Sequence, residues 1–301
     1  MNRVGFIGLG NMGGPMCTHL VDAGFDVTAF DLDDAALERL RGAGAHAARS
    51  GVECASDAEA LITMLPGPSQ VEQVLLGKDG ALAAMSAGTI AIDMSTSSTS
   101  VGRRVNHAAA ERGIDVLDAP VAGQATGARA GTLSIYVGGS EPVLERARPL
   151  FEAIGNPERI FHLGPNGAGY TVKILLNLLW FIQSVATAEV LTVGVRAGVA
   201  LDKLHGALVG SPANSNFLER DVRSVLDSGD YDEAFPMQLV TKDLALAVDL
   251  ARDVGMPVEL TGLVEQIHRR ARATYGDDAG EISAMRLYED VAGLQLRMPS
   301  G

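Results

Sequence analysis

The sequence predicts an α/β N-terminal domain over residues 1–164, followed by an all-α C-terminal domain over residues 165–301. In the first part, short apolar runs alternate with helical patterns, as expected for a mostly parallel, doubly wound sheet. A glycine-rich turn directly follows the first apolar run. Beyond residue 164 the apolar residues recur at helical spacing, while Gly and Pro gather between segments.

The elements of the first domain follow one another as strand, helix, strand. Gly, Pro, Asp or Asn residues bound most of the apolar runs, which is typical of strands that end in turns. Helical patterns over residues 15–23 and 34–42 separate the first strands. The expected strands are Val4–Gly8, Val27–Asp31, Ala60–Met64, Thr89–Asp93, Ile114–Ala119 and Leu133–Gly138.

Composition limits the classes of function. The 301 residues are 47% hydrophobic and carry a net charge of −13, so a globular protein is expected and nucleic acid is disfavoured as a partner. The two cysteines are too few for a disulfide framework, and the six histidines show no metal-ligand spacing, so no metal is expected. The run 174–182 is too short to cross a bilayer, and the first strand begins at Val4 without a leader. We therefore expect a cytoplasmic protein that does not contact a membrane.

The turn after the first strand has the spacing of a dinucleotide-binding, Rossmann-type motif. Gly8 permits a tight turn, Gly10 lets the backbone approach a pyrophosphate, and Gly13 lets the helix pack against the strand. Asn11 and Met12 lie in the turn, where their backbone N–H groups are expected to contact the cofactor. The pattern alone is weak, but here it follows a strand and opens a helix, which is the context it requires.

The second strand ends at Asp31, 18 residues after Gly13. A carboxylate there can accept hydrogen bonds from the ribose hydroxyls and would repel a 2′-phosphate. No basic residue follows before Arg39. The sequence therefore favours NAD over NADP.

Two further turns follow strands of the same sheet. Leu65 and Pro66 close one strand, and Ser95 and Thr96 close another. Ligands bind at the carboxyl ends of such strands, so these turns are expected to contact the cofactor. For Ser95 and Thr96, capping of the following helix is an equally good interpretation.

Four segments, in this order and spacing, resemble the β-hydroxyacid dehydrogenase family, which includes 3-hydroxyisobutyrate dehydrogenase and is similar to 6-phosphogluconate dehydrogenase. The resemblance extends over nearly the whole chain. The segments are Gly8–Gly13, Asp118–Leu133, Gly167–Asn177 and Lys242–Ala247.

The resemblance implies roles for individual residues. Lys173 matches the catalytic lysine of the family, and Asn177 matches the asparagine that helps to place the substrate. Thr96 and Lys242 match positions that contact the nicotinamide cofactor. Residues 122–124 match the turn that receives the substrate carboxylate.

The chain departs from its relatives in that turn. Where the family has Ser-Gly-Gly, this sequence has Ala122, Gly123 and Gln124, so a hydroxyl is absent and an amide is added. Leu176 replaces the first residue of the usual Asn-Asn pair. These changes leave the type of reaction intact and leave the substrate open.

The residues themselves allow acid/base chemistry. Lys173 and Asn177 are four apart on a predicted helix, hence one turn apart on one face. Apolar neighbours are expected to lower the pKa of such a lysine, as acid/base catalysis near neutral pH requires. From spacing alone, a lysine whose stem reaches water is the better explanation; the resemblance favours catalysis.

The sequence thus predicts an NAD-dependent oxidoreductase that interconverts a short 3-hydroxy acid and its semialdehyde or keto form. An imine reductase-like NAD(P)H enzyme and a non-catalytic nucleotide-binding module are the alternatives. Lys173 argues against the first, whereas the absence of a serine hydroxyl at Ala122 leaves it open. The retention of Lys173, Asn177 and Lys242 argues against the second. The long apolar helix that begins near Thr171 predicts a homodimer or higher homo-oligomer.

Overall fold

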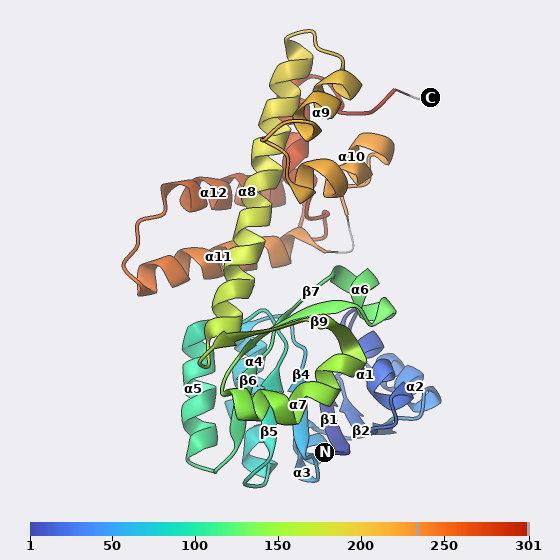
Figure 1. Cartoon of the computed structure of the whole chain (residues 1–301), viewed down its shortest axis with the longest axis vertical. Coiled ribbons are helices and arrows are strands. Elements are labelled where there is room, and N and C mark those ends of the chain that lie inside the picture. The colour runs from blue at the N-terminus through green and yellow to red at the C-terminus, as the bar shows by residue number, and fades with distance from the viewer. Residues whose placement is uncertain (233–234, 300–301) are drawn as a thin grey trace. The chain divides into compact units, whose positions relative to one another are not determined.

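A computed structural model describes residues 1–232 and 235–299, and the chain forms two compact units (Figure 1). Unit 1 is Met1–Lys173 and unit 2 is Ile174–Gly301. Unit 1 contains the sheet, and the described part of unit 2 is helical.

The sheet of unit 1 has nine strands, and its central part is parallel. The order is β3-β2-β1-β4-β5-β6-β8-β7, with β9 paired to β8. Neighbours from β3 to β6 pair in parallel, which confirms the doubly wound sheet. The strands are β1 (Arg3–Ile7), β2 (Asp26–Phe30), β3 (His46–Ala47), β4 (Ala60–Thr63), β5 (Ile90–Asp93), β6 (Asp115–Asp118), β7 (Val121–Ala122), β8 (Leu133–Gly138) and β9 (Gly155–Gly164).

Helices cover both faces of this sheet. Alternate strand residues point to opposite faces, so Phe6 lies in a core with α1, α2 and α7, whereas Ile7 lies in a core with α3, α4 and α5. Burial on both faces explains why the central strands are continuous apolar runs. The helices are α1 (Gly13–Asp22), α2 (Asp34–Gly42), α3 (Gly51–Ser56), α4 (Pro68–Leu76), η1 (Ala81–Ala84), α5 (Thr99–Ala110), α6 (Gln124–Ala130) and α7 (Glu141–Ile154).

The far edge of the sheet differs from the rest. β8 pairs antiparallel with β6 and β7, and parallel with β9. Sequence patterning does not reveal β7 or β9, because β7 is two residues long and most side chains of β9 are at least partly exposed. This edge carries the turn at residues 122–124.

Unit 2 is organised around the remainder of helix α8 (Ala168–Arg196), which begins in unit 1. Phe181 and Val185 pack with α11, α12 and α13, and Ala188 and Leu191 pack with α9 and α10. The all-α second part is thereby confirmed for the described residues. Its further helices are α9 (Leu201–Val209), η2 (Phe217–Asp221), α10 (Arg223–Ser228), α11 (Met237–Asp253), α12 (Glu259–Tyr275), η3 (Ser283–Met285) and α13 (Arg286–Ala292).

Helix α8 is longer than its apolar run suggests. Its 29 residues include an 18-residue window of mean hydropathy 1.7, of which 33% is buried. By length and composition α8 therefore meets the requirements of a membrane-crossing helix, as core helices of soluble proteins also do. The run 174–182 is short, but uncharged polar residues such as Asn177 and Gln183 interrupt the apolar sequence without ending the long helix that was expected from Thr171 onward.

Candidate functional site

The glycine turn after β1 has the geometry that its spacing predicts. Gly8 has φ +99°, and a Cβ there would lie 2.2 Å from the carbonyl oxygen of Met64. A Cβ on Gly13 would lie 1.9 Å from the carbonyl oxygen of Gly8. Both positions therefore exclude side chains. A Cβ on Gly10 would meet no atom within 4 Å, which leaves open space beside the backbone for a bound group.

The beginning of α1 fits a dinucleotide pyrophosphate. No side chain caps the helix at Met12, so the positive end of the helix dipole is open to an anion. Within the first turn the N–H of Gly14 already donates to the carbonyl oxygen of Gly10, and Pro15 has no N–H, so the N–H groups of the preceding turn are the ones left for a phosphate. Asn11 is exposed in the turn, and Met12 is half-buried. The open space at Gly10 and the uncapped helix end thus fit the cofactor predicted from the motif.

Asp31 ties the glycine turn to the end of β2. Its Oδ2 accepts a hydrogen bond of 2.5 Å from the N–H of Leu9, and its Oδ1 accepts one of 2.9 Å from the N–H of Asp33. An ionised carboxylate has about four acceptor positions, so it can also accept from ribose hydroxyls. Asp31 therefore supports the turn as well as facing the cofactor pocket.

A pocket of about 450 Å³ lies beside this turn, within the usual size range of ligand sites. Gly10, Asn11 and Asp31 line it, as predicted. Arg39 and Arg129 also line it, although both are far from the glycine turn in sequence. Helix α2 folds Arg39 back toward β2, where its guanidinium lies 3.8 Å from the carboxylate of Asp33.

The turns after β4 and β5 are joined by hydrogen bonds. The N–H of Leu65 donates to Ser95 Oγ at 2.8 Å, and Ser95 Oγ donates to the buried carboxylate of Asp93 at 2.6 Å. Pro66 is exposed and Thr96 is half-buried in these turns. Ser98, rather than Ser95 or Thr96, caps helix α5, by accepting from the N–H of Val101.

The turn at residues 122–124 joins β7 to α6. Ala122 ends β7, Gly123 has φ +131°, and Gln124 begins α6 with φ +54°. The left-handed region is unfavourable for a residue with a side chain and costs about 1–2 kcal/mol. Glycine, which the family has at this position, adopts it freely. This chain thus keeps an exposed glutamine at a strained position.

Lys173 lies in the second turn of α8, at the end of unit 1, and is half-buried. The chain enters α8 through hydrogen bonds to the sheet: the N–H groups of Gly167 and Tyr170 donate to the carboxylate of Asp118. Desolvation by burial raises the pKa of Asp118 to about 6, against the opposing effect of these two donors. The backbone that carries Lys173 is therefore anchored to the end of β6.

In unit 2, Asn177 and Lys242 meet at a residue that the sequence analysis did not single out. The amide Nδ2 of Asn177 donates to Asp243 Oδ2 at 2.7 Å, and Lys242 Nζ lies 2.8 Å from Asp243 Oδ1. The side chain of Asp243 is 1% exposed. Its signal in the sequence is a carboxylate on the apolar face of a helix, where an unpaired charge is rarely tolerated.

Among the described residues, no group of three or more His, Cys, Asp or Glu side chains could hold a metal ion. In unit 1 the groups around the glycine turn are backbone N–H groups and the carboxylate of Asp31, which can bind an organic cofactor.

The two parts of the chain match two family models. Residues 3–164 match the NAD binding domain of 6-phosphogluconate dehydrogenase, and residues 167–288 match the NAD-binding model of NADP-dependent 3-hydroxyisobutyrate dehydrogenase. The chain belongs to the β-hydroxyacid dehydrogenase family. The resemblance deduced from the four segments is confirmed, and so are the fold class and the use of NAD as cofactor.

Curated relatives match almost end to end. The chain is 37% identical over 295 residues to 2-(hydroxymethyl)glutarate dehydrogenase of Eubacterium barkeri. This alignment covers 98% of this chain and 97% of the relative. It is 39% identical over 275 residues to NAD-dependent L-serine dehydrogenase of Pseudomonas aeruginosa, covering 89% and 92%. The structure of Mycobacterium tuberculosis 3-hydroxyisobutyrate dehydrogenase with L-serine superposes with a TM-score of 0.88 at 32% identity, covering 95% and 99%.

Asp31 generates a prediction about cofactor choice. We expect NADH to bind at least about tenfold more tightly than NADPH, which corresponds to about 1.4 kcal/mol of charge repulsion and lost ribose hydrogen bonds. Asp31→Asn should narrow this ratio, and Asp31→Asn with Arg39→Ala should bind NADPH less well than Asp31→Asn alone. Fluorescence titration measures both affinities.

Asp34→Asn is the matched control, because Asp34 is an exposed first-turn residue of α2 outside the pocket. Tighter binding of NADPH than of NADH by the unchanged protein would contradict the role of Asp31. An unchanged ratio of NADH affinity to NADPH affinity in Asp31→Asn would also contradict the role of Asp31.

Proposed function

We propose that this protein oxidises a short 3-hydroxy acid with NAD⁺, or reduces the corresponding semialdehyde with NADH, using Lys173 as the acid/base. The observation that carries the proposal is the lysine itself. It stands at the family's catalytic position, on a helix start anchored to the NAD-binding unit through Asp118.

NAD⁺ supplies the hydride acceptor when it is bound. Lys173 takes the proton from the substrate hydroxyl as hydride leaves the carbinol carbon, and returns it in the reverse direction. The turn at Ala122 and Gly123 offers backbone N–H groups to the substrate carboxylate. Lys242 and Thr96 contact the nicotinamide cofactor in this proposal.

Asn177 orients the substrate through its amide oxygen. Asp243 accepts a hydrogen bond from Nδ2, so the amide has its nitrogen toward this carboxylate and its oxygen Oδ1 is the acceptor of the group. An acceptor of this kind suits a substrate hydroxyl. Lys242 balances the charge of Asp243, so the cluster can stay buried without an unpaired carboxylate.

The relatives suggest the class of substrate. Their names specify 2-(hydroxymethyl)glutarate, L-serine and 3-hydroxyisobutyrate. All three compounds are 3-hydroxypropionates that differ only in the group on C2. We propose a substrate of this kind, with Gln124 contacting the C2 substituent.

Lys173→Ala should lower kcat by a factor of about 10²–10⁴, the usual contribution of a general acid/base, with little change in NADH affinity. The measurement is NADH formation with a panel of C2-substituted 3-hydroxypropionates. Lys203→Ala is the control, because its side chain is 81% exposed on α9.

Near-normal turnover by Lys173→Ala would refute the assignment. The same samples, assayed for NADPH oxidation with cyclic imines, test the imine reductase alternative. Tight cofactor binding without turnover on either panel would support a non-catalytic binding module.

Gln124 has two features that can be tested separately: its left-handed backbone, which affects stability, and its amide, which is proposed to contact the substrate. Gln124→Gly should raise the free energy of unfolding by about 1 kcal/mol, because glycine relieves the left-handed strain. Gln124→Ala retains the strain and removes the amide. Both variants should raise KM for the preferred substrate severalfold; thermal unfolding and KM measure the two effects. An unchanged KM in both variants would contradict substrate contact.

We also propose a homodimer or higher homo-oligomer. Apolar side chains of α8 are widely exposed, including Leu179 at 57% and Val193 at 68%, and a second copy would cover them. Light scattering should give at least about 63 kDa, twice the chain mass of 31.4 kDa. Val193→Glu should lower that mass. A single-chain mass for the unchanged protein would refute the proposal.

A further inference from the structure

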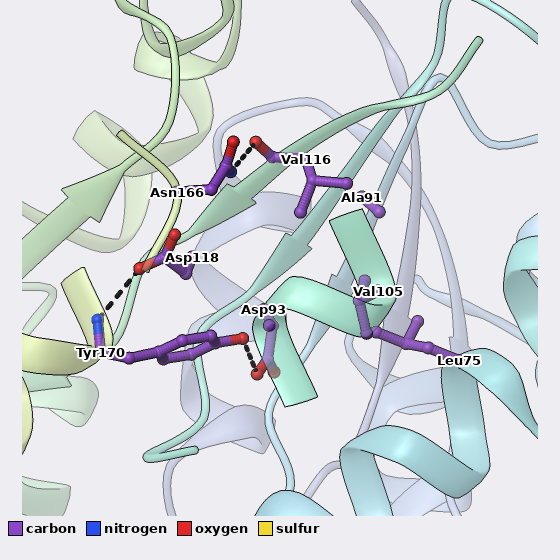
Figure 2. A pocket seen from close by; sticks show the side chains of 9 residues that line it. Leu75, Ala91, Asp93, Val105, Val116, Asp118, Asn166 and Tyr170 are labelled. Atoms are coloured by element: carbon purple, nitrogen blue, oxygen red, sulfur yellow. Dashed lines mark hydrogen bonds between the residues drawn. The ribbon is translucent and has the colours of Figure 1, made fainter. Parts of the chain in front are cut away.

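The beginning of α8 is held by a buried carboxylate at the end of β6. Asp118 Oδ1 accepts from the N–H of Gly167 at 2.7 Å, and Oδ2 accepts from the N–H of Tyr170 at 3.0 Å. Such N–H groups have no partner within their own helix. Asn166 adds a third bond, from its Nδ2 to the carbonyl oxygen of Val116 at 2.7 Å (Figure 2).

The side chain of Tyr170 makes a second attachment, to the neighbouring strand. Its hydroxyl donates to Asp93 Oδ2 at 2.6 Å, and both residues are buried (Figure 2). Burial raises the pKa of Asp93 and raises that of Tyr170 well above its usual value, so the phenol keeps its proton and donates. The other oxygen of Asp93 accepts from Thr63 Oγ1 at 2.7 Å and from Ser95 Oγ at 2.6 Å.

The packing around these bonds leaves little freedom. A Cβ on Gly169 would lie 2.3 Å from the carbonyl oxygen of Tyr136, and one on Gly102 would lie 2.7 Å from the ring of Tyr170. The cavity beside Asp93 and Asp118 measures about 10 Å³, room for at most one water. The helix start therefore cannot shift without breaking hydrogen bonds.

These bonds form one chain across unit 1. It runs from the N–H of Leu65, in a turn expected to contact the cofactor, through Ser95 and Asp93 to Tyr170. Lys173 follows Tyr170 by three residues, hence by about one helical turn. A displacement of about 1 Å in a reacting group can cost a factor of about 10² in rate.

We infer that Tyr170, held between the carboxylates of Asp93 and Asp118, is a positioning residue that sets the place of Lys173. The inference rests on the proposed function, in which Lys173 is the acid/base. A purely structural tyrosine would support the stability of unit 1 and would not affect turnover selectively.

Asp93 and Asp118 should respond differently to replacement by asparagine, because Asp93 Oδ2 accepts from a hydroxyl and Asp118 accepts from backbone N–H groups. In Asp93→Asn, the amide nitrogen can take the place of Oδ2 and donate to the Tyr170 hydroxyl, which then accepts, so the link survives. Asp118 allows no such exchange, because each of its oxygens faces a backbone N–H and one would face the amide nitrogen instead.

The test compares Tyr170→Phe, Asp93→Asn, Asp93→Ala and Asp118→Asn, with Tyr136→Phe as the control that removes a half-buried hydroxyl from β8. Tyr170→Phe, Asp93→Ala and Asp118→Asn should lower kcat by about 10–100-fold, with KM for NAD⁺ changed less than threefold. Asp93→Asn and Tyr136→Phe should stay within threefold of the unchanged protein in kcat. Thermal unfolding and NADH titration confirm that each variant is folded; if Asp118→Asn does not fold, the comparison of Tyr170→Phe with Asp93→Asn decides.

Three results would overturn the inference: a kcat of Tyr170→Phe within twofold of normal, an equal loss in Asp93→Asn and Asp93→Ala, or a loss shared by Tyr136→Phe. The turnover of Lys173→Ala shows whether a negative result concerns only the positioning role of Tyr170 or also the proposed acid/base role of Lys173. An inactive Lys173→Ala beside a fully active Tyr170→Phe refutes the positioning role alone. A fully active Lys173→Ala refutes both.

Discussion

The parallel pairing of β1, β4, β5 and β6 determines where the functional groups of unit 1 meet. Strands that run in parallel end at the same edge of a sheet, so residues that follow them become neighbours whatever their separation in sequence. Gly8, Leu65, Asp93 and Asp118 all follow or end these strands. The glycine turn supplies the close approach at this edge, and the later strands supply the polar groups.

Aspartate carboxylates then connect this edge to its surroundings. Asp31 accepts from the glycine turn, Asp93 from Tyr170, and Asp118 from the start of α8. In unit 2, Asp243 accepts from Asn177. A buried carboxylate is costly unless donors surround it, so the three buried groups, Asp93, Asp118 and Asp243, depend on the arrangement of their partners. The same bonds that satisfy the charges thus define the backbone positions on which the proposed chemistry depends.

Local patterns predicted much of this protein. The apolar runs located the five longer strands of the parallel region and β8 to within a few residues, because burial on both faces leaves a clear signal. The strands β3, β7 and β9 were not predicted, since β3 and β7 are two residues long and β9 is largely exposed. Asp243 lies within the segment Lys242–Ala247, which resembles the family, yet its partner Asn177 is 66 residues away, and spacing along the chain does not predict that contact.

The sequence by itself determined the alternation of strand and helix, the glycine turn, and the family of the chain, to whose motif Lys173 and Asn177 were matched. The alternation and the glycine turn depend on neighbours within about one or two elements, and the family is indicated by the order and spacing of four segments along the chain. Tertiary structure decided that Arg39 lines the pocket beside Asp31, that Gln124 adopts a left-handed conformation, and that Tyr170 spans two carboxylates. These features join distant strands and helices, and only the folded chain brings their atoms within hydrogen-bonding distance.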